Sequence, residues 1–471
     1  MDVDIVLVNP PYLTKEVYGN LYKAAGIFPP LGLAYVAANL EKHGYSVKII
    51  DNEDSWDETF KDIKSCRPKI LGVTCTSPLL KDVIKIASFA KKLGSKVVVG
   101  GIHATSSPEE MAKHEEFDVI SFGEAEHTIL EIVQALYGEK DLKDVKGISF
   151  REEGKIIKTK NRSLQENINK LPFPAYHLLD MEKYRFYSLF DRTKNFFTMI
   201  TIRGCPFTCV FCNTRTMFDR KVRLRSPRNV FEDVKLLNKK YSIKEIYFYD
   251  DTFTLNRDRT LALCDLLEKS DLQLLWSTET RSDKVDHFLL NKMKQAGCYM
   301  IGYGFESADQ DILNKLKKGT TVEKNIEAVK LTHQAGMLVR AFLLIGAPGE
   351  TKSTIQKTVN FSLMKGITYA HFNIVTPYPD TLLWHKAVNE GMLDPEEVSG
   401  MGAIANVKAY KKLVGTDLDA DKVKKEWIKA NIRFYVRPYW IYTMIKNIRG
   451  WYHFKNVLKA LLGFLQGLIQ K

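Results

Sequence analysis

Short apolar runs alternate with amphipathic stretches over the first part of the chain. The runs lie at Asp4–Val8, Ser46–Asp51, Lys69–Thr74, Lys96–Gly100 and Asp118–Phe122. Each run is short and apolar, as expected of strands that are buried on both faces of a sheet. Stretches with helical periodicity, such as Leu31–His43 and Leu80–Leu93, separate the runs. This alternation predicts a Rossmann-like, doubly wound parallel sheet over residues 1–140.

Small and polar residues occupy the predicted carboxyl ends of these strands and the turns that follow. They are Asn9, Pro11, Thr74, Thr76, Ser77, Gly100, Gly101, His103, Gly123, Glu124 and Glu126. Sheets of this type bind ligands at the carboxyl ends of their strands, and glycines there allow a bulky flat ligand to approach the backbone. No Gly-x-Gly-x-x-Gly segment follows the first strand, so the sequence does not predict a dinucleotide ligand.

Residues 141–192 have the features of a linker. They include a predicted hairpin, Gly147–Phe150 with Lys155–Lys158, and a segment around Leu171–His177 in which prolines alternate with other residues. Proline-rich segments of this kind favour an extended connection between domains.

The alternation of strands and helices resumes at Phe197. The predicted strands are Thr198–Ile202, Glu245–Tyr249, Gln273–Ser277, Tyr299–Gly304, Arg340–Ile345 and His371–Val375. Six βα units predict a partial TIM-type barrel over residues 193–390, with its functional residues at the carboxyl ends of the strands. Residues 391–471 depart from this pattern and predict a helical C-terminal region.

Composition narrows the class of protein further. The chain has 471 residues, 45% of them hydrophobic, which is ordinary for a globular protein of two or three domains. No run of about 18 apolar residues is present, so no transmembrane helix is predicted. The absence of a recognisable secretion signal predicts a reducing, cytoplasmic location.

The net charge of +13 is concentrated at one end of the chain. Trp427–Lys471 contains eight Lys or Arg residues and no Asp or Glu. The rest of the chain is only mildly basic, which argues against a nucleic-acid partner. Basic residues interleaved with Trp and Tyr are typical of a helix that lies peripherally on an anionic membrane surface. A helical cap over a hydrophobic substrate, or a basic helix packed on the barrel, would show the same pattern.

Three closely spaced cysteines carry the clearest chemical signal. Cys205, Cys209 and Cys212 form a Cys-x3-Cys-x2-Cys run just after the first predicted barrel strand. Three thiolates on one loop can hold three irons of a 4Fe-4S cluster and leave the fourth iron open for chemistry. A zinc site normally needs four ligands, and disulfides would leave one of the three thiols unpaired. The remaining cysteines, Cys66, Cys75, Cys264 and Cys298, are scattered and are predicted to be buried or half-buried thiols.

The cysteine run, with Phe211 directly before its third cysteine, resembles the cluster loop of the radical S-adenosylmethionine (SAM) superfamily. In that family the open iron chelates SAM, and an electron from the cluster cleaves SAM to a 5′-deoxyadenosyl radical. The resemblance implies a 4Fe-4S cluster, SAM as cosubstrate, and an electron donor such as flavodoxin or ferredoxin.

The same resemblance implies SAM contacts at the barrel strand ends. The residues that match these positions are Phe211, Asp250, Asp251, Glu279, Arg281, Glu306, Ile345 and Tyr378. Asp250 and Asp251 replace the family's Gly-Gly-Glu, and carboxylates remain suitable acceptors for the SAM ammonium. Helix capping would also explain these two aspartates. Ile345 would pack on adenine, and Arg281 would pair with the SAM carboxylate.

The N-terminal region resembles the cobalamin-binding domain of the cobalamin-dependent radical SAM subfamily, in its Pro29–Tyr35 segment and its Gly-Gly-Ile-His loop. This resemblance implies that the residues at the first set of strand ends bind cobalamin. The Asp-x-His-x-x-Gly motif that supplies a cobalt ligand in many such domains is absent, and His103 lacks the aspartate. We therefore expect no protein histidine on cobalt. A degenerate domain that binds nothing is the alternative.

These resemblances imply a radical enzyme that methylates an unactivated carbon of a hydrophobic or large substrate. A second hypothesis keeps the cofactors but changes the reaction to oxidation or ring formation, as in the anaerobic Mg-protoporphyrin ester cyclases. A third is a non-catalytic cobalamin-binding or metal-binding regulator, which the intact cysteine loop disfavours.

Overall fold

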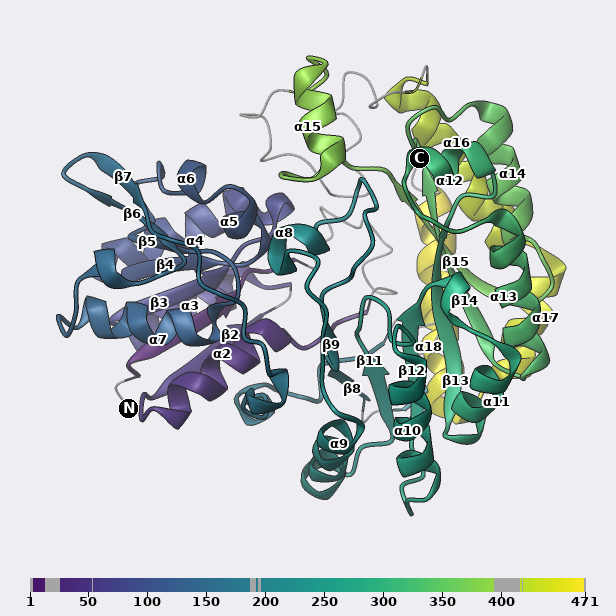
Figure 1. The fold of residues 1–471 in the computed structure, drawn as a ribbon, viewed down its shortest axis with the longest axis horizontal. Coiled ribbons are helices and arrows are strands. Elements are labelled where there is room, and N and C mark those ends of the chain that lie inside the picture. The colour runs from purple at the N-terminus through teal and green to yellow at the C-terminus, as the bar shows by residue number, and fades with distance from the viewer. Residues whose placement is uncertain are drawn as a thin grey trace.

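The structure is a computed structural model that describes residues 3–12, 26–52, 54–186, 192–193, 196–393, 416 and 418–469. A seven-stranded sheet forms one half of the molecule, and a six-stranded barrel sheet with its helices forms the other (Figure 1). The loop that bears the three cysteines and helix α8 (Thr214–Phe218) lies between these halves.

The N-terminal sheet has the order β2-β1-β3-β4-β5-β6-β7. Its strands are β1 (Ile5–Asn9), β2 (Val47–Asp51), β3 (Ile70–Thr74), β4 (Lys96–Gly100), β5 (Val119–Ser121), β6 (Ile148–Glu152) and β7 (Lys155–Lys158). The first five strands are parallel. β6 and β7 form the hairpin that was expected in the connector, and they extend the sheet as its antiparallel edge.

Helices cover both faces of this sheet, which confirms the doubly wound class. They are α2 (Leu31–Lys42), α3 (Trp56–Cys66), α4 (Leu80–Lys92), α5 (Ile102–Ser106), α6 (Pro108–Met111) and α7 (Ala125–Leu136). Alternate residues of β1 enter different cores: Leu7 packs in the cluster of α2 and α7, whereas Val6 packs in the cluster of α3 and α4. Two-sided burial explains why these strands are continuously apolar in the sequence.

The barrel sheet is parallel and has the order β15-β14-β13-β12-β11-β8. Its strands are β8 (Phe196–Met199), β11 (Glu245–Phe248), β12 (Leu275–Thr280), β13 (Cys298–Glu306), β14 (Leu338–Ile345) and β15 (Ile367–Ile374). Its helices are α9 (Pro227–Tyr241), α10 (Arg257–Glu268), α11 (His287–Gln295), α12 (Gln310–Lys315), α13 (Val322–Gln334), α14 (Lys352–Ser362) and α15 (Leu382–Asn389). The partial-barrel prediction is confirmed.

The first barrel strand ends earlier than predicted. β8 stops at Met199, and the chain continues into the two-residue strand β9 (Ile202–Arg203), which pairs with β10 (Arg223–Leu224). The Asp250 carboxylate accepts hydrogen bonds from the backbone amides of Thr201 (2.6 Å) and Ile202 (2.9 Å). These bonds satisfy amides that leave the sheet, so the bend that leads to the cysteine loop is fixed by a residue of the neighbouring strand.

Three helices complete the chain: α16 (Ala420–Tyr435), α17 (Pro438–Asn447) and α18 (Gly450–Ile469). α16 packs along the outer strand β15, and its Trp427 indole donates to the Phe372 carbonyl at 2.6 Å. Within the described residues, no helix is long and apolar enough to cross a membrane.

Candidate active site

The three cysteines of the loop gather around one small hollow. Cys205, Cys209 and Cys212 are half-buried free thiols between β9 and α8, and all three line a hollow of about 30 Å³. Within the described residues, no three His, Cys, Asp or Glu side chains are arranged around a single metal ion. A 4Fe-4S cluster does not require such convergence, because each cysteine binds a different iron.

Backbone contacts fix the conformation of this loop. The Val210 amide donates to the Leu316 carbonyl at 3.1 Å, and the Leu383 amide donates to the Val210 carbonyl at 2.9 Å. Gly204 has a φ of +90°, and a Cβ there would lie 2.2 Å from the Lys221 carbonyl oxygen, so only glycine fits directly before Cys205. The loop is therefore held at both sides of the cysteine run.

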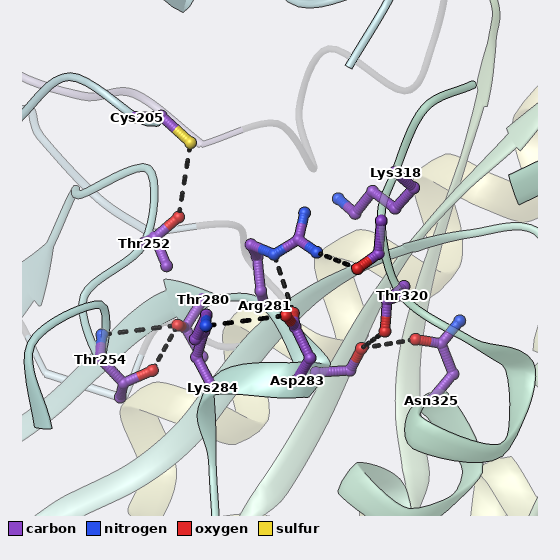
Figure 2. A network of polar contacts seen from close by, with 12 residues as sticks. Cys205, Thr252, Thr254, Thr280, Arg281, Asp283, Lys284, Lys318, Thr320 and Asn325 are labelled. Atoms are coloured by element: carbon purple, nitrogen blue, oxygen red, sulfur yellow. Dashed lines mark hydrogen bonds and ion pairs between the residues drawn. The ribbon is translucent and has the colours of Figure 1, made fainter. Parts of the chain in front are cut away.

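Arg281 supports the same loop from the end of β12. Its guanidinium lies 3.6 Å from the centre of the Phe207 ring, and Phe207 lies between the first two cysteines. Its Nε donates to Asp283 at 2.8 Å, and its Nη2 donates to the Gly319 carbonyl at 3.2 Å (Figure 2). The structure thus gives Arg281 partners within the protein, and its predicted pairing with the SAM carboxylate stays a prediction.

A buried ion pair lies at the end of β13, beside the cysteines. Lys318 Nζ donates to Glu306 Oε1 at 2.7 Å, and both side chains are less than 10% exposed. A Cβ on Gly304 would lie 2.8 Å from Lys318 Nζ, so the glycine makes room for the pair. Lys318 also lies beside Arg281 (Figure 2). Burial raises the pKa of the Cys209 thiol; the Lys318 charge opposes this rise, and the Glu306 carboxylate adds to it. Glu306 was predicted from the sequence, whereas Lys318 was not.

The two adjacent aspartates after β11 point to different partners. Asp250 is 2% exposed and accepts from Thr201 and Ile202, as described above. Burial raises its pKa, although these hydrogen bonds oppose the effect. Asp251 is exposed and accepts a 3.4 Å hydrogen bond from Thr214, which lies two residues after Cys212. Asp251 is thus the better placed of the two to meet a SAM ammonium.

The other predicted SAM contacts are distributed between the mouth and the core. Glu279 accepts from Tyr247 and, at 2.9 Å, from Arg340, and it remains partly exposed. Phe211 and Tyr378 are half-buried. Ile345 is fully buried in the barrel core, and its predicted contact with adenine stays a prediction.

A cavity of about 340 Å³ lies at the carboxyl edge of the N-terminal sheet. Six residues predicted at this edge line it: Thr74, Gly100, Gly101, Gly123, Glu124 and Glu126. The cavity is closed from the other side by residues of the barrel half that sequence reasoning missed, including Ile200, Ile202, Met217, Phe218 and Tyr249. The aromatic and apolar residues of α8, directly after the cysteine run, were the feature of the sequence that could have indicated this part of the lining.

The remaining residues predicted at this edge lie outside the lining of the cavity. They are Asn9, Pro11, Thr76, Ser77 and His103. Asn9 donates to Asp51 at 2.9 Å, and Ser77 lies 3.0 Å from His103 Nδ1. His103 is 1% exposed, and burial lowers its pKa to about 4, so the ring is neutral. That no histidine ligates cobalt stays a prediction.

Buried ion pairs join the two halves of the molecule beside this cavity. Arg203, two residues before Cys205, donates to Glu124 at 2.7 Å and to Glu126. Arg223 of β10 also donates to Glu124, at 2.6 Å. All four side chains are about 10% exposed or less. The loop that carries the cysteines is therefore tied directly to the edge of the N-terminal sheet.

Comparison with known proteins agrees with this geometry. Residues 199–362 match the model of the radical SAM superfamily, and residues 19–133 match that of the B12 binding domain. An uncharacterized methyltransferase of Pyrococcus horikoshii is 34% identical over 97% of this chain and 98% of its own length. The chain is a B12-domain member of the radical SAM superfamily. The cofactors of this family are a 4Fe-4S cluster, SAM and cobalamin.

Two further relatives show the breadth of the family. The anaerobic magnesium-protoporphyrin IX monomethyl ester cyclase of Rubrivivax gelatinosus is 30% identical over 80% of this chain and 68% of its own length. The radical SAM methyltransferase TsrM of Kitasatospora setae, solved with cobalamin and a 4Fe-4S cluster, shares the fold with a TM-score of 0.66 at 19% identity. That match covers 82% of this chain and 75% of TsrM.

The residues present fit these cofactors. Gly123 lines the cavity, and a Cβ there would meet no atom within 4 Å, so the backbone at this point of the edge leaves open space that a large planar ring can occupy. At the hollow, three thiols stand beside the hydroxyls of Thr252, 3.8 Å from Cys205, and Thr214, 3.3 Å from Cys212. The Thr214 hydroxyl donates to the Asp251 carboxylate and the Thr252 hydroxyl donates to the Asp251 carbonyl at 2.7 Å, so both hydroxyls hold Asp251 beside the cysteines.

Proposed function

We propose that this protein methylates an unactivated carbon of a hydrophobic, lipid-like or otherwise large substrate. When bound, the cluster and SAM supply the radical chemistry that activates a carbon, and cobalamin carries the methyl group. Support comes from the methyltransferase of Pyrococcus horikoshii, which this chain matches over nearly its whole length.

One observation carries the proposal: a hydrogen bond joins a residue that lines the cluster hollow to a residue that lines the cobalamin cavity. Thr214 lies 3.3 Å from the Cys212 sulfur and donates to Asp251 at 3.4 Å. Thr214 lines the hollow, and Asp251 lines the cavity. A substrate carbon held in this cleft is within reach of both sites, which is the geometry that radical formation followed by methyl transfer needs.

The chain's own residues position and shield this chemistry. Cys205, Cys209 and Cys212 hold the cluster, and Asp251 receives the SAM ammonium. The Lys318–Glu306 pair holds both of its charged groups in place beside Cys209. Residues 1–140, extended by the hairpin at 148–158, form the cobalamin domain, and residues 193–390 form the radical SAM domain.

Radical oxidation with ring closure is the second candidate. The relative in Rubrivivax gelatinosus, a cyclase by name, is 30% identical and matches 80% of this chain. The same cleft could present a substrate carbon to the radical without any methyl transfer.

The test is an anaerobic assay of the reconstituted enzyme with SAM that carries a deuterated methyl group. Flavodoxin or ferredoxin serves as reductant, extracts of the source organism supply the substrate, and Cys209→Ala is the control. We expect labelled methyl in an apolar product that the variant does not form. A product that has lost hydrogen and gained no label would establish the cyclase class instead. No SAM cleavage with any extract would favour a non-catalytic role.

A further inference from the structure

The exposed apolar side chains of this molecule are concentrated on its last three helices. Of fourteen large hydrophobic residues exposed in the described part of the chain, nine follow residue 430. They are Ile432, Val436, Ile441, Tyr442, Ile445, Trp451, Phe454, Leu458 and Leu462. Surface hydrophobic residues scattered singly need no explanation, but a concentration of this kind marks an interaction surface.

On α18 these residues form one stripe. Trp451, Phe454, Leu458 and Leu462 are spaced by three or four positions, which places them along one side of the helix. The exposed rings of Trp451 and Phe454 stack with their centres 5.3 Å apart. On α17, Ile441, Tyr442 and Ile445 are likewise neighbours, and Tyr442 is 61% exposed.

The helices do not need these side chains in order to pack on the barrel. Other residues do that: Val423, Ala430 and Phe434 of α16, Trp440 and Met444 of α17, and Val457 of α18. Polar bonds secure the attachment, because Tyr435 donates to the Ala370 carbonyl at 2.7 Å and Arg437 donates to the Ile367 carbonyl at 2.8 Å. Each helix therefore has one face packed on the barrel and one apolar face exposed. In Figure 1, α17 lies on the side of the barrel away from the N-terminal sheet.

Charge decides what can cover the outer faces. Arg433, Lys446, Arg449 and Lys455 are exposed among the apolar residues, and no acid follows Glu426 in the chain. Lys455 Nζ lies 5.3 Å from the centre of the Trp451 ring, so a cation borders the aromatic stripe. Two copies of this chain that faced each other through α17 and α18 would bring like charges together, because these helices contain no Asp or Glu.

We propose that the outer faces of α17 and α18 bind the surface of an anionic lipid bilayer. The apolar stripe enters the boundary between headgroups and acyl chains, Trp451 and Tyr442 lie at the water interface, and the cations contact lipid phosphates. Attachment is peripheral, since none of the described helices can cross a membrane. The proposal does not rest on methyl transfer, although it would bring the barrel to water-insoluble substrates.

Flotation of the purified full-length protein with lipid vesicles tests this proposal. Vesicles of phosphatidylcholine alone are compared with vesicles that also contain phosphatidylglycerol, at low and at high salt. We expect flotation only with the anionic vesicles and release at high salt, because the attraction is screened. Equal flotation with both vesicle types, or none with either, would overturn the proposal.

Two matched pairs of variants locate the surface. Lys446→Gln/Arg449→Gln/Lys455→Gln should weaken binding by about 100-fold, at about five-fold per cation. The control Lys61→Gln/Lys64→Gln/Lys81→Gln removes the same charge from exposed positions of the N-terminal half and should leave binding nearly unchanged.

Trp451→Ser/Phe454→Ser should abolish flotation, whereas Phe288→Ser, at a 55% exposed position on α11, should not. If a control variant lost as much vesicle binding as its matched variant, these helices would not be the lipid-binding surface. If the wild-type protein were a dimer that Trp451→Ser dissociates, the face would bind a second copy of the chain instead of lipid.

Discussion

The two halves of this molecule present the carboxyl edges of parallel strands to one cleft, but the edges differ in the residues that form them. At the N-terminal sheet the edge consists largely of Thr74, Gly100, Gly101 and Gly123, with little side-chain matter. At the barrel the edge carries charged side chains that are paired with one another, such as Glu306 with Lys318 and Glu279 with Arg340.

The difference shows two ways of preparing a site for a cofactor. A bare edge makes room, so a large ring can be held by shape and by contact with the backbone. A charged edge fixes position, because buried ions must keep their partners. The Arg203 bonds to Glu124 and Glu126 connect the two edges and set the distance between them.

Removing the cluster ligands should have the largest effect on activity, and it should affect only the cofactor of the barrel half. Changing Cys205, Cys209 or Cys212 to Ala should remove most of the cluster and all SAM cleavage, because each thiolate holds a separate iron. Iron content and visible absorbance after anaerobic reconstitution measure the loss, and corrinoid binding should persist. The control Cys66→Ser changes a half-buried thiol far along the chain from the loop and should leave the iron content unchanged.

Breaking the ion pair beside the cluster should have the next largest effect. Lys318→Met leaves the Glu306 carboxylate buried without its partner and should lower the free energy of unfolding by about 3–5 kcal/mol. Chemical denaturation measures the change, with Lys317→Met as control, since Lys317 is exposed. The double variant Glu306→Gln/Lys318→Met should recover much of the loss. Equal costs for Lys317→Met and Lys318→Met would mean that the pair does not fix the barrel edge.

The two halves should also respond to pH with opposite sign. Burial lowers the pKa of His103 from 6.5 to about 4, so the unfolded chain binds more protons between these values, and stability falls as pH drops below 6.5. Burial raises the pKa of Glu350, after β14, from 4.5 to about 7, so the folded chain holds the extra proton, and stability falls as pH rises from 4.5 to 7.

Each pKa shift changes the free energy of unfolding by roughly 3 kcal/mol once the pH has passed through both pKa values. His103→Gln should flatten the acid limb of the stability profile, and Glu350→Gln should flatten the neutral limb. Thermal unfolding across this pH range, followed by circular dichroism, would show both. A variant profile parallel to that of the wild type would contradict the assignment of that residue.

Adding side chains to the bare edge should have the smallest effect on stability but a specific effect on corrinoid binding. Gly101 has a φ of +101° and a ψ of −173°, a region open almost only to glycine, so Gly101→Ala should cost about 1–3 kcal/mol. Gly100→Ala should fold normally, because a Cβ there makes only ordinary contact with Ser121 at 3.8 Å. It should still weaken corrinoid binding, measured by spectroscopic titration. Unchanged binding in Gly100→Ala would show that the ligand does not approach this backbone.

The parts of this account that sequence could predict are the local patterns. β4 spans the predicted range Lys96–Gly100, and the cysteine run falls between a strand and a helix as expected. Contacts between distant segments could not be predicted: nothing near Arg203 in the sequence indicates pairing with Glu124 and Glu126, which lie nearly eighty residues earlier. Lys318 was missed for the same reason.

The direction in which each of two adjacent residues points was also not predictable from the sequence. Asp250 is turned away from the cavity by its bonds to the Thr201 and Ile202 amides, and the apolar pattern of the strand does not reveal these contacts.

We expect the cluster and cobalamin to occupy facing sites in one cleft, joined by the hydrogen bond between Thr214 and Asp251. Electron paramagnetic resonance of the doubly loaded enzyme, with the cluster reduced and cobalt as Co(II), tests this claim most directly. We expect a magnetic interaction that broadens both signals and disappears in Cys209→Ala, while the Co(II) signal itself persists. Two sharp, independent signals from an enzyme that retains both cofactors would contradict it.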